Sequence, residues 1–75
     1  MTAIETANNF ASLMETASFG GPGCEGKAIN ARKVSWYLTQ TPYWGGPPPT
    51  VEEARAAAKR AWGDRVPADV AEALA

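Results

Sequence analysis

Histidine is absent from this chain of 75 residues, and cysteine occurs only once, at Cys24. Histidine is the commonest general base and metal ligand, so a hydrolytic triad or a zinc site would lack its usual residues. One cysteine cannot form a disulfide within the chain, which is typical of a reducing compartment. The sequence therefore predicts a cytoplasmic, non-enzymatic protein that holds no metal and no cofactor.

Long apolar runs are missing too. No stretch approaches the roughly 18 apolar residues of a membrane-spanning helix, and residues 1–5 do not have the basic start of a signal peptide. The net charge is only −1, which argues against a protein that binds nucleic acid through its overall charge. We expect no membrane contact.

Large aliphatic side chains are scarce. Isoleucine, leucine, valine and phenylalanine together number eleven, against 15 alanines. This share lies below the roughly 20% at which disorder becomes common. The low net charge and the seven aromatic residues favour a folded chain instead. We predict one small domain over residues 1–75 with a marginal core, to which tryptophan burial or association adds stability.

Two capping boxes predict helix starts, one at Thr2-Ala3-Ile4-Glu5 and one at Thr50-Val51-Glu52-Glu53. The helix after Thr2 is expected to stop at Gly20-Gly21-Pro22, and the helix after Thr50 at Gly63. Their predicted buried faces are, in order, Ile4, Ala7, Phe10, Ala11, Met14 and Ala17, and Val51, Ala54, Ala58, Ala61 and Trp62.

Two further helices are indicated. Asn30 is a typical N-cap and Pro42 disfavours helical geometry before it, which predicts a helix from Ala31 to about Gln40. Pro67 favours the first turn of a short last helix. The predicted buried stripes are Ala31, Val34, Tyr37 and Leu38, and then Val66, Val70, Ala73 and Leu74.

No segment alternates like a strand for long enough to predict one. The expected fold class is therefore all-α, a compact bundle of about four short helices. A Gly-rich loop at Gly20–Gly26 and an aromatic and proline-rich loop between the second and third helices complete it. The alanine-rich strip after Thr50 would let a second copy of the chain approach closely, so both a monomer and a homodimer agree with the sequence.

Three cations lie around the start of the helix predicted at Ala31, namely Lys27, Arg32 and Lys33. Cations oppose the helix dipole there and free helix amides bind phosphate, so this cluster is a candidate nucleic-acid-binding site. Ser35 and Trp36 are expected on the exposed side of the same helix. Alternatively, Arg32 and Trp36 are spaced for a cation–π contact, or the cations form a solvated face.

In the segment Gly26–Leu38 a small polar residue precedes the pattern Ala-Arg-x-Val-x-x-x-Leu. This segment resembles the recognition segment of helix-turn-helix and winged-helix proteins. That motif joins its helices by a tight turn, whereas about ten residues intervene here, from Gly20 to Asn30. The resemblance implies a small DNA-binding protein that uses the helix starting near Ala31.

The segment from Trp36 to Pro49 holds two of the three tryptophans and four of the six prolines. Consecutive prolines form a polyproline turn whose ridges fit flat aromatic rings. They either fold back on a tryptophan and close the core, or stand out as an apolar patch that another protein binds. The candidate protein-binding residues are Trp36, Tyr43, Trp44, Pro47 and Pro48.

Cys24 is expected to be an inert thiol, with a reactive thiol as the alternative.

The frequent alanine, glycine, proline and arginine are what GC-rich coding favours. We therefore expect a phage or bacterial accessory or inhibitor protein that binds another protein, with DNA binding as the alternative function.

Overall fold

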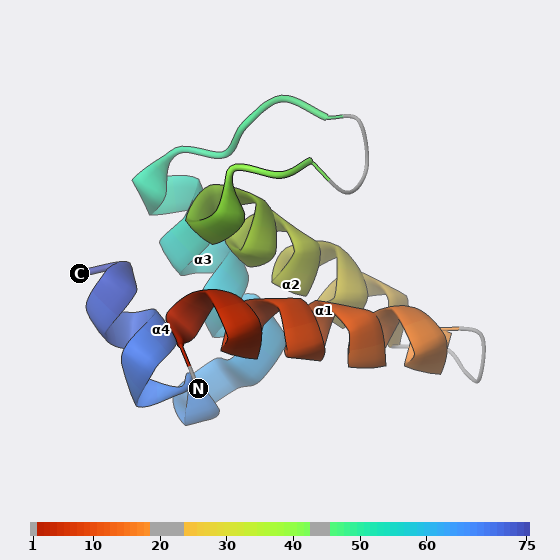
Figure 1. The fold of residues 1–75 in the computed structure, drawn as a ribbon. Coiled ribbons are helices and arrows are strands. Elements are labelled where there is room, and N and C mark those ends of the chain that lie inside the picture. Colours follow the sequence, from red (N-terminus) through yellow and green to blue (C-terminus); the bar gives the residue numbers. More distant parts are fainter. Residues whose placement is uncertain (1, 19–23, 43–45) are drawn as a thin grey trace.

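The computed structural model describes the backbone of residues 2–18, 24–42 and 46–75, and the side chains of residues 2–15, 26–42 and 46–75. The described residues form four α-helices and no strand, which confirms the all-α class (Figure 1). A short 3-10 helix connects the last two. In chain order the elements are α1 (Ala3–Ser18), α2 (Cys24–Thr39), α3 (Val51–Trp62), η1 (Gly63–Arg65) and α4 (Ala68–Ala73).

Helix α2 lies between α1 and α3, and α1 and α2 run in opposite directions (Figure 1). A side-chain hydrogen bond joins α1 to α2: the hydroxyl of the buried Ser35 donates to Oδ1 of the partly exposed Asn8 at 2.5 Å. Helix α4 lies beside the start of α1, where the Thr6 hydroxyl donates to Asp69 Oδ2 at 2.8 Å. The short fourth helix is thereby tied to the bundle by a polar contact as well as by apolar packing.

Both predicted capping sites are confirmed. The Glu5 amide donates to Thr2 Oγ1 at 3.1 Å and the Thr2 amide donates to Glu5 Oε2 at 3.2 Å, which is a complete capping box. At α3 the Glu53 amide donates to Thr50 Oγ1 at 3.2 Å, while the Glu53 carboxylate accepts from the Thr50 hydroxyl. Helix α3 ends at Gly63, as expected, with a φ of 65° that favours glycine.

The predicted start of α2 is wrong. This helix begins at Cys24, seven residues before Ala31, and Asn30 lies inside it with its Nδ2 donating to the Gly26 carbonyl at 2.9 Å. The extra turns bury Ala28, which is only 4% exposed and continues the apolar stripe toward the N-terminus. Packing of this stripe overrides the local preference of asparagine for a cap. The Gly-rich loop is correspondingly shorter than Gly20–Gly26.

The C-terminal end of α2 falls where the sequence predicts, since the helix stops at Thr39. Gln40 follows with a φ of 60°, and its amide still donates to the Trp36 carbonyl at 2.8 Å. This left-handed conformation closes many helices, but it suits glycine much better than glutamine. Helix α4 begins at Ala68, one residue later than expected, with Pro67 as its N-cap residue.

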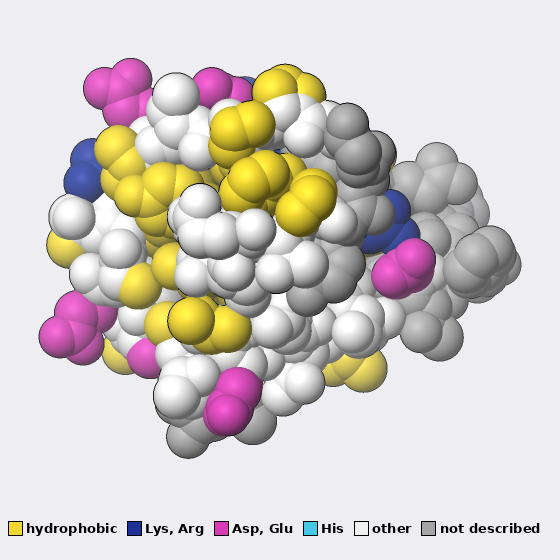
Figure 2. Space-filling model, turned by 45° about the horizontal axis from the view of Figure 1, so that its top comes forward, with side chains coloured by type: hydrophobic (Ala, Val, Ile, Leu, Met, Phe, Trp, Pro, Cys, Tyr) yellow, Lys and Arg dark blue, Asp and Glu magenta, His cyan; other side chains and the backbone are white. Residues whose placement is uncertain are grey.

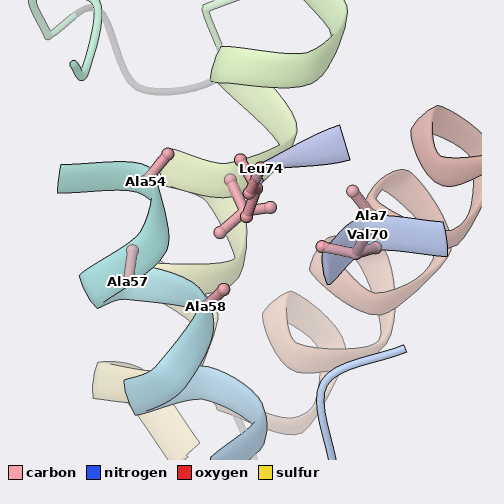
Figure 3. Packing of buried hydrophobic residues seen from close by; sticks show 7 residues of the cluster. Ala7, Ala54, Ala57, Ala58, Val70 and Leu74 are labelled. Carbon is pink, nitrogen blue, oxygen red and sulfur yellow. The ribbon is translucent and has the colours of Figure 1, made fainter. Parts of the chain in front are cut away.

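The core consists mainly of alanine methyl groups. Figure 3 shows Ala54 and Ala58 on the side of α3 toward Leu74, and Val70 beside Ala7. Trp62 packs against both core clusters, and its ring lies 4.3 Å from that of Phe10 between centroids. The two clusters are Ala7, Val34, Ala54, Ala57, Ala58, Val70 and Leu74, and then Ala11, Ala31 and Ala61.

Among the described side chains of the predicted buried faces, two are exposed instead, while the side chain of Ala17 lies outside the described ones. Ile4 is 44% exposed because it lies in the first turn of α1, and Ala73 is exposed in the last turn of α4. The alanine strip that was expected to receive a second copy is occupied within the chain, since Ala54, Ala58 and Ala61 are each at most 5% exposed. These three alanines therefore pack within the chain, and whether the chain forms a homodimer stays a prediction.

The close packing of α3 predicts that leucine is tolerated at Ala56 but not at the neighbouring Ala57. Ala57 is 1% exposed, whereas Ala56 is exposed on the same helix. Ala57→Leu should lower the free energy of unfolding by about 1–3 kcal/mol because the added carbons have no space. Ala56→Leu should change it by less than about 0.5 kcal/mol. Urea denaturation followed by circular dichroism measures both, and equal losses would contradict this packing.

The left-handed conformation of Gln40 predicts that glycine is more stable than alanine at this position. Gln40→Gly should raise the free energy of unfolding relative to Gln40→Ala by about 1 kcal/mol, because both variants lose the amide side chain and only alanine keeps the strained Cβ. Chemical denaturation of the two variants isolates the backbone effect. A glycine variant that is less stable than the alanine variant would show that φ is negative at this position.

Candidate protein-binding surface

Helix α2 has one side that neither α1 nor α3 covers. Ile29, Lys33 and Trp36 lie on this side, because residues three, four and seven positions apart share a face of a helix. We call these three residues the outer face of α2. Ile29 is 45% exposed, while Lys33 and Trp36 are partly exposed. The residues that point inward from the same helix are Ala28, Ala31, Val34 and Ser35, all of them buried.

The orientation of Trp36 makes its accessible surface apolar. The indole Nε1 is buried and has no acceptor among the described residues, so the exposed part of the ring consists of carbon. An interfacial tryptophan commonly does the opposite and keeps its N–H in contact with water or a partner. Trp36 is partly exposed, as expected, but Ser35 is fully buried in its hydrogen bond with Asn8. The expectation that Ser35 lies on the exposed side is therefore wrong.

The three prolines before α3 do not all agree with one interpretation of the aromatic and proline-rich loop. One interpretation places them in the core, and the other places them in an exposed patch that a partner binds. Pro49 is buried and delivers Thr50 to its cap, as the core interpretation requires, whereas Pro47 and Pro48 are exposed. The segment 46–50 forms part of an arch above the bundle (Figure 1). Figure 2 shows hydrophobic side chains on this side in separate patches, with acidic groups near the margin. Tyr43 and Trp44 lie outside the described residues.

The three predicted nucleic-acid contacts are not brought together. Arg32 forms an ion pair with Glu15 of α1, in which Nη2 lies 2.6 Å from Oε1, and its Nε is buried without an acceptor. Lys27 is exposed in the second turn of α2. It is separated from Lys33 by six residues, which corresponds to about 240° around a helix. The cations therefore point to different sides of α2.

Other kinds of site find no support in the described parts of the chain. No three His, Cys, Asp or Glu side chains gather there as metal ligands would. None of the described helices has the length and apolar character that a membrane span requires. The side chain of Cys24 lies outside the described side chains.

Ile29 was missed by the sequence interpretation. The helix was expected to begin at Ala31, which left Ile29 in a loop. Once the helix begins at Cys24, Ile29 and Trp36 are separated by seven residues and lie almost in line along one face. The signal that could have revealed this is the alanine at position 28, because it places a small residue one turn before Ala31.

The buried indole nitrogen predicts how Trp36 responds to substitution. Trp36→Phe removes a donor that has no acceptor, which offsets the loss of ring area, so the free energy of unfolding should change by less than about 1 kcal/mol. Trp62→Phe should cost more, about 1–3 kcal/mol, because Trp62 packs against both core clusters. Thermal and urea denaturation compare the pair. If Trp36→Phe lowers the free energy of unfolding more than Trp62→Phe does, the indole nitrogen of Trp36 has a hydrogen-bond acceptor in solution and the prediction is wrong.

Comparisons of the chain with protein-family models, with curated proteins and with solved structures found no match. Its function is therefore inferred from its own surface. The outer face of α2 and the exposed prolines Pro47 and Pro48 together offer rigid apolar side chains, and this is the property on which a function can be built.

Proposed function

We propose that this chain is a non-enzymatic binding protein that contacts another protein through the outer face of α2 and through Pro47 and Pro48. The observation that supports the proposal is the orientation of Trp36, whose nitrogen is buried and whose carbon edge is exposed. A partner gains by covering this edge because apolar area leaves water, and no hydrogen bond to the indole is required.

The side chains of this surface are well suited to an interface. Tryptophan and proline have few rotatable bonds, so little conformational entropy is lost when they are covered. Ile29 extends the apolar area along α2, and Lys33 supplies the polar margin typical of interfaces. Because the chain is small and has no catalytic constellation among its described residues, it would act by covering a surface on a larger protein. This is how a phage or bacterial accessory or inhibitor protein works.

DNA binding is the weaker proposal. Its three cations point to different sides of α2, and Arg32 is already neutralised by Glu15. Binding that depends on phosphate contacts requires cations that face one backbone together. No observation on the described residues favours this function over protein binding.

Capture by the immobilised chain tests the proposal. We expect it to retain a protein from a nuclease-treated lysate of the cells that encode it, and Ile29→Lys should abolish this retention. Leu13→Lys is the matched control, because Leu13 is also an exposed apolar side chain, at 64%, but lies on α1. Retention should persist at high salt, since apolar contacts are not screened.

Three results would contradict the proposal. One is that no protein is retained, and another is that Leu13→Lys abolishes retention as completely as Ile29→Lys. The third is retention that disappears at high salt, which would indicate phosphate contacts and restore DNA binding as the better function.

A further inference from the structure

A surface groove lies on another part of the molecule, between the C-terminal half of α3, η1 and α4. It has a volume of about 360 Å³. Its floor contains the buried Ala58 and Leu74, and its walls contain the partly exposed Val66 and the exposed Ala71. The groove is open to solvent along its length. An open apolar groove buries only one side of its occupant, whereas small-molecule sites enclose most of the ligand.

Two cations line one wall of this groove. Arg55 and Lys59 both lie on α3, four residues apart, which places them about 6 Å apart along the helix axis. Arg55 is held in place because its Nε donates to the Leu74 carbonyl. Its two terminal nitrogens and the ammonium group of Lys59 form no hydrogen bond or ion pair within the described residues. No acidic side chain is among the described residues that line the groove.

Further charged residues lie near the groove: Arg60 and Arg65 on the side of α3 and η1, and Glu72 on α4 next to Ala71. Arg60 and Arg65 are exposed on the same end of α3 and on η1, and Asp64 is the only acidic residue of the stretch 59–65. An occupant therefore meets an apolar lining and two spaced cations, Arg55 and Lys59. This combination complements apolar side chains flanked by carboxylates.

We propose that this groove binds an acidic amphipathic helix of another protein. One helix turn separates Arg55 from Lys59, and the same distance separates carboxylates at positions i and i+4 of a partner helix. Leucine-like side chains of that helix enter the groove between α3 and α4 while its carboxylates lie along the Arg55 and Lys59 wall, which is the helix-in-groove mode of recognition. This site is separate from the outer face of α2 and does not depend on it.

A synthetic peptide tests the proposal directly. The probe is a helical peptide of about 14 residues, or about four turns, with a leucine stripe and glutamate pairs at i and i+4. Its counterpart carries lysine at every glutamate position. We expect saturable binding of the acidic peptide by fluorescence anisotropy, with the counterpart at least about fivefold weaker. Amide chemical-shift changes should be largest at Ala58, Lys59, Val66, Ala71 and Leu74.

Two matched pairs of variants locate the site. Lys59→Glu should weaken binding of the acidic peptide about fivefold, whereas Arg60→Glu, the next residue of the same helix turn but outside the groove lining, should change it less than about twofold. Ala71→Glu places a carboxylate in the lining of the groove and should abolish binding of the acidic peptide. Ala73→Glu, on the same helix but outside the lining, should leave it unchanged. All four residues are exposed, and circular dichroism verifies that each variant is folded.

The proposal is wrong if both peptides bind equally, if neither binds, or if the shift changes map to Ile29 and Trp36. It is also wrong if the chain forms a dimer in sedimentation that Lys59→Glu dissociates, because the occupant would then be a second copy. Ile29→Lys should leave peptide binding unchanged. A failure at the groove is thus distinguishable from a failure of the proposed function.

Discussion

Close contact between alanine-lined helix surfaces is the interaction on which the rest of this structure depends. Ala31 and Val34 of α2 are fully buried; Val34 shares a core cluster with Ala54 of α3, and Ala31 shares one with Ala61 of α3. Methyl groups allow the helix backbones to approach, but each one buries little apolar area. The larger side chains Tyr37, Leu38 and Trp62 consequently pack at the edge of the core, where part of each stays accessible. A small-residue core therefore leads directly to an apolar surface.

Polar contacts fix the elements that this core holds only weakly. Ser35 and Asn8 set the position of α2 on α1, and Thr6 and Asp69 set the position of α4. Such partly buried hydrogen bonds contribute modestly when they are made and cost more when one partner is lost, so they specify geometry more than they add stability. The bond from Arg55 to the Leu74 carbonyl has the same role for the groove, since it holds the end of α4 against α3.

The sequence predicts those parts of the fold that depend on neighbouring residues. The capping boxes at Thr2 and Thr50 and the glycine at position 63 are local signals, and the helix boundaries that they predict are confirmed. The start of α2 depends on burial of Ala28 by other helices; a single alanine is a weaker local signal than the N-cap preference of Asn30, so Asn30 gave a wrong boundary. Ser35 was misplaced for the same reason, because its burial requires Asn8, 27 residues earlier in the chain.

The candidate surfaces were predictable to different degrees for related physical reasons. Trp36, Pro47 and Pro48 could be named from composition, since rigid apolar residues in a polar loop are unusual, but the inward direction of the indole nitrogen depends on packing. The groove could not be foreseen, because Lys59 and Ala71 are brought together only by the turn through η1.

Binding at either surface is coupled to folding in so small a domain. A ligand present at about 100 times its Kd adds about 2.7 kcal/mol, which is a large fraction of the free energy of unfolding of a marginal core.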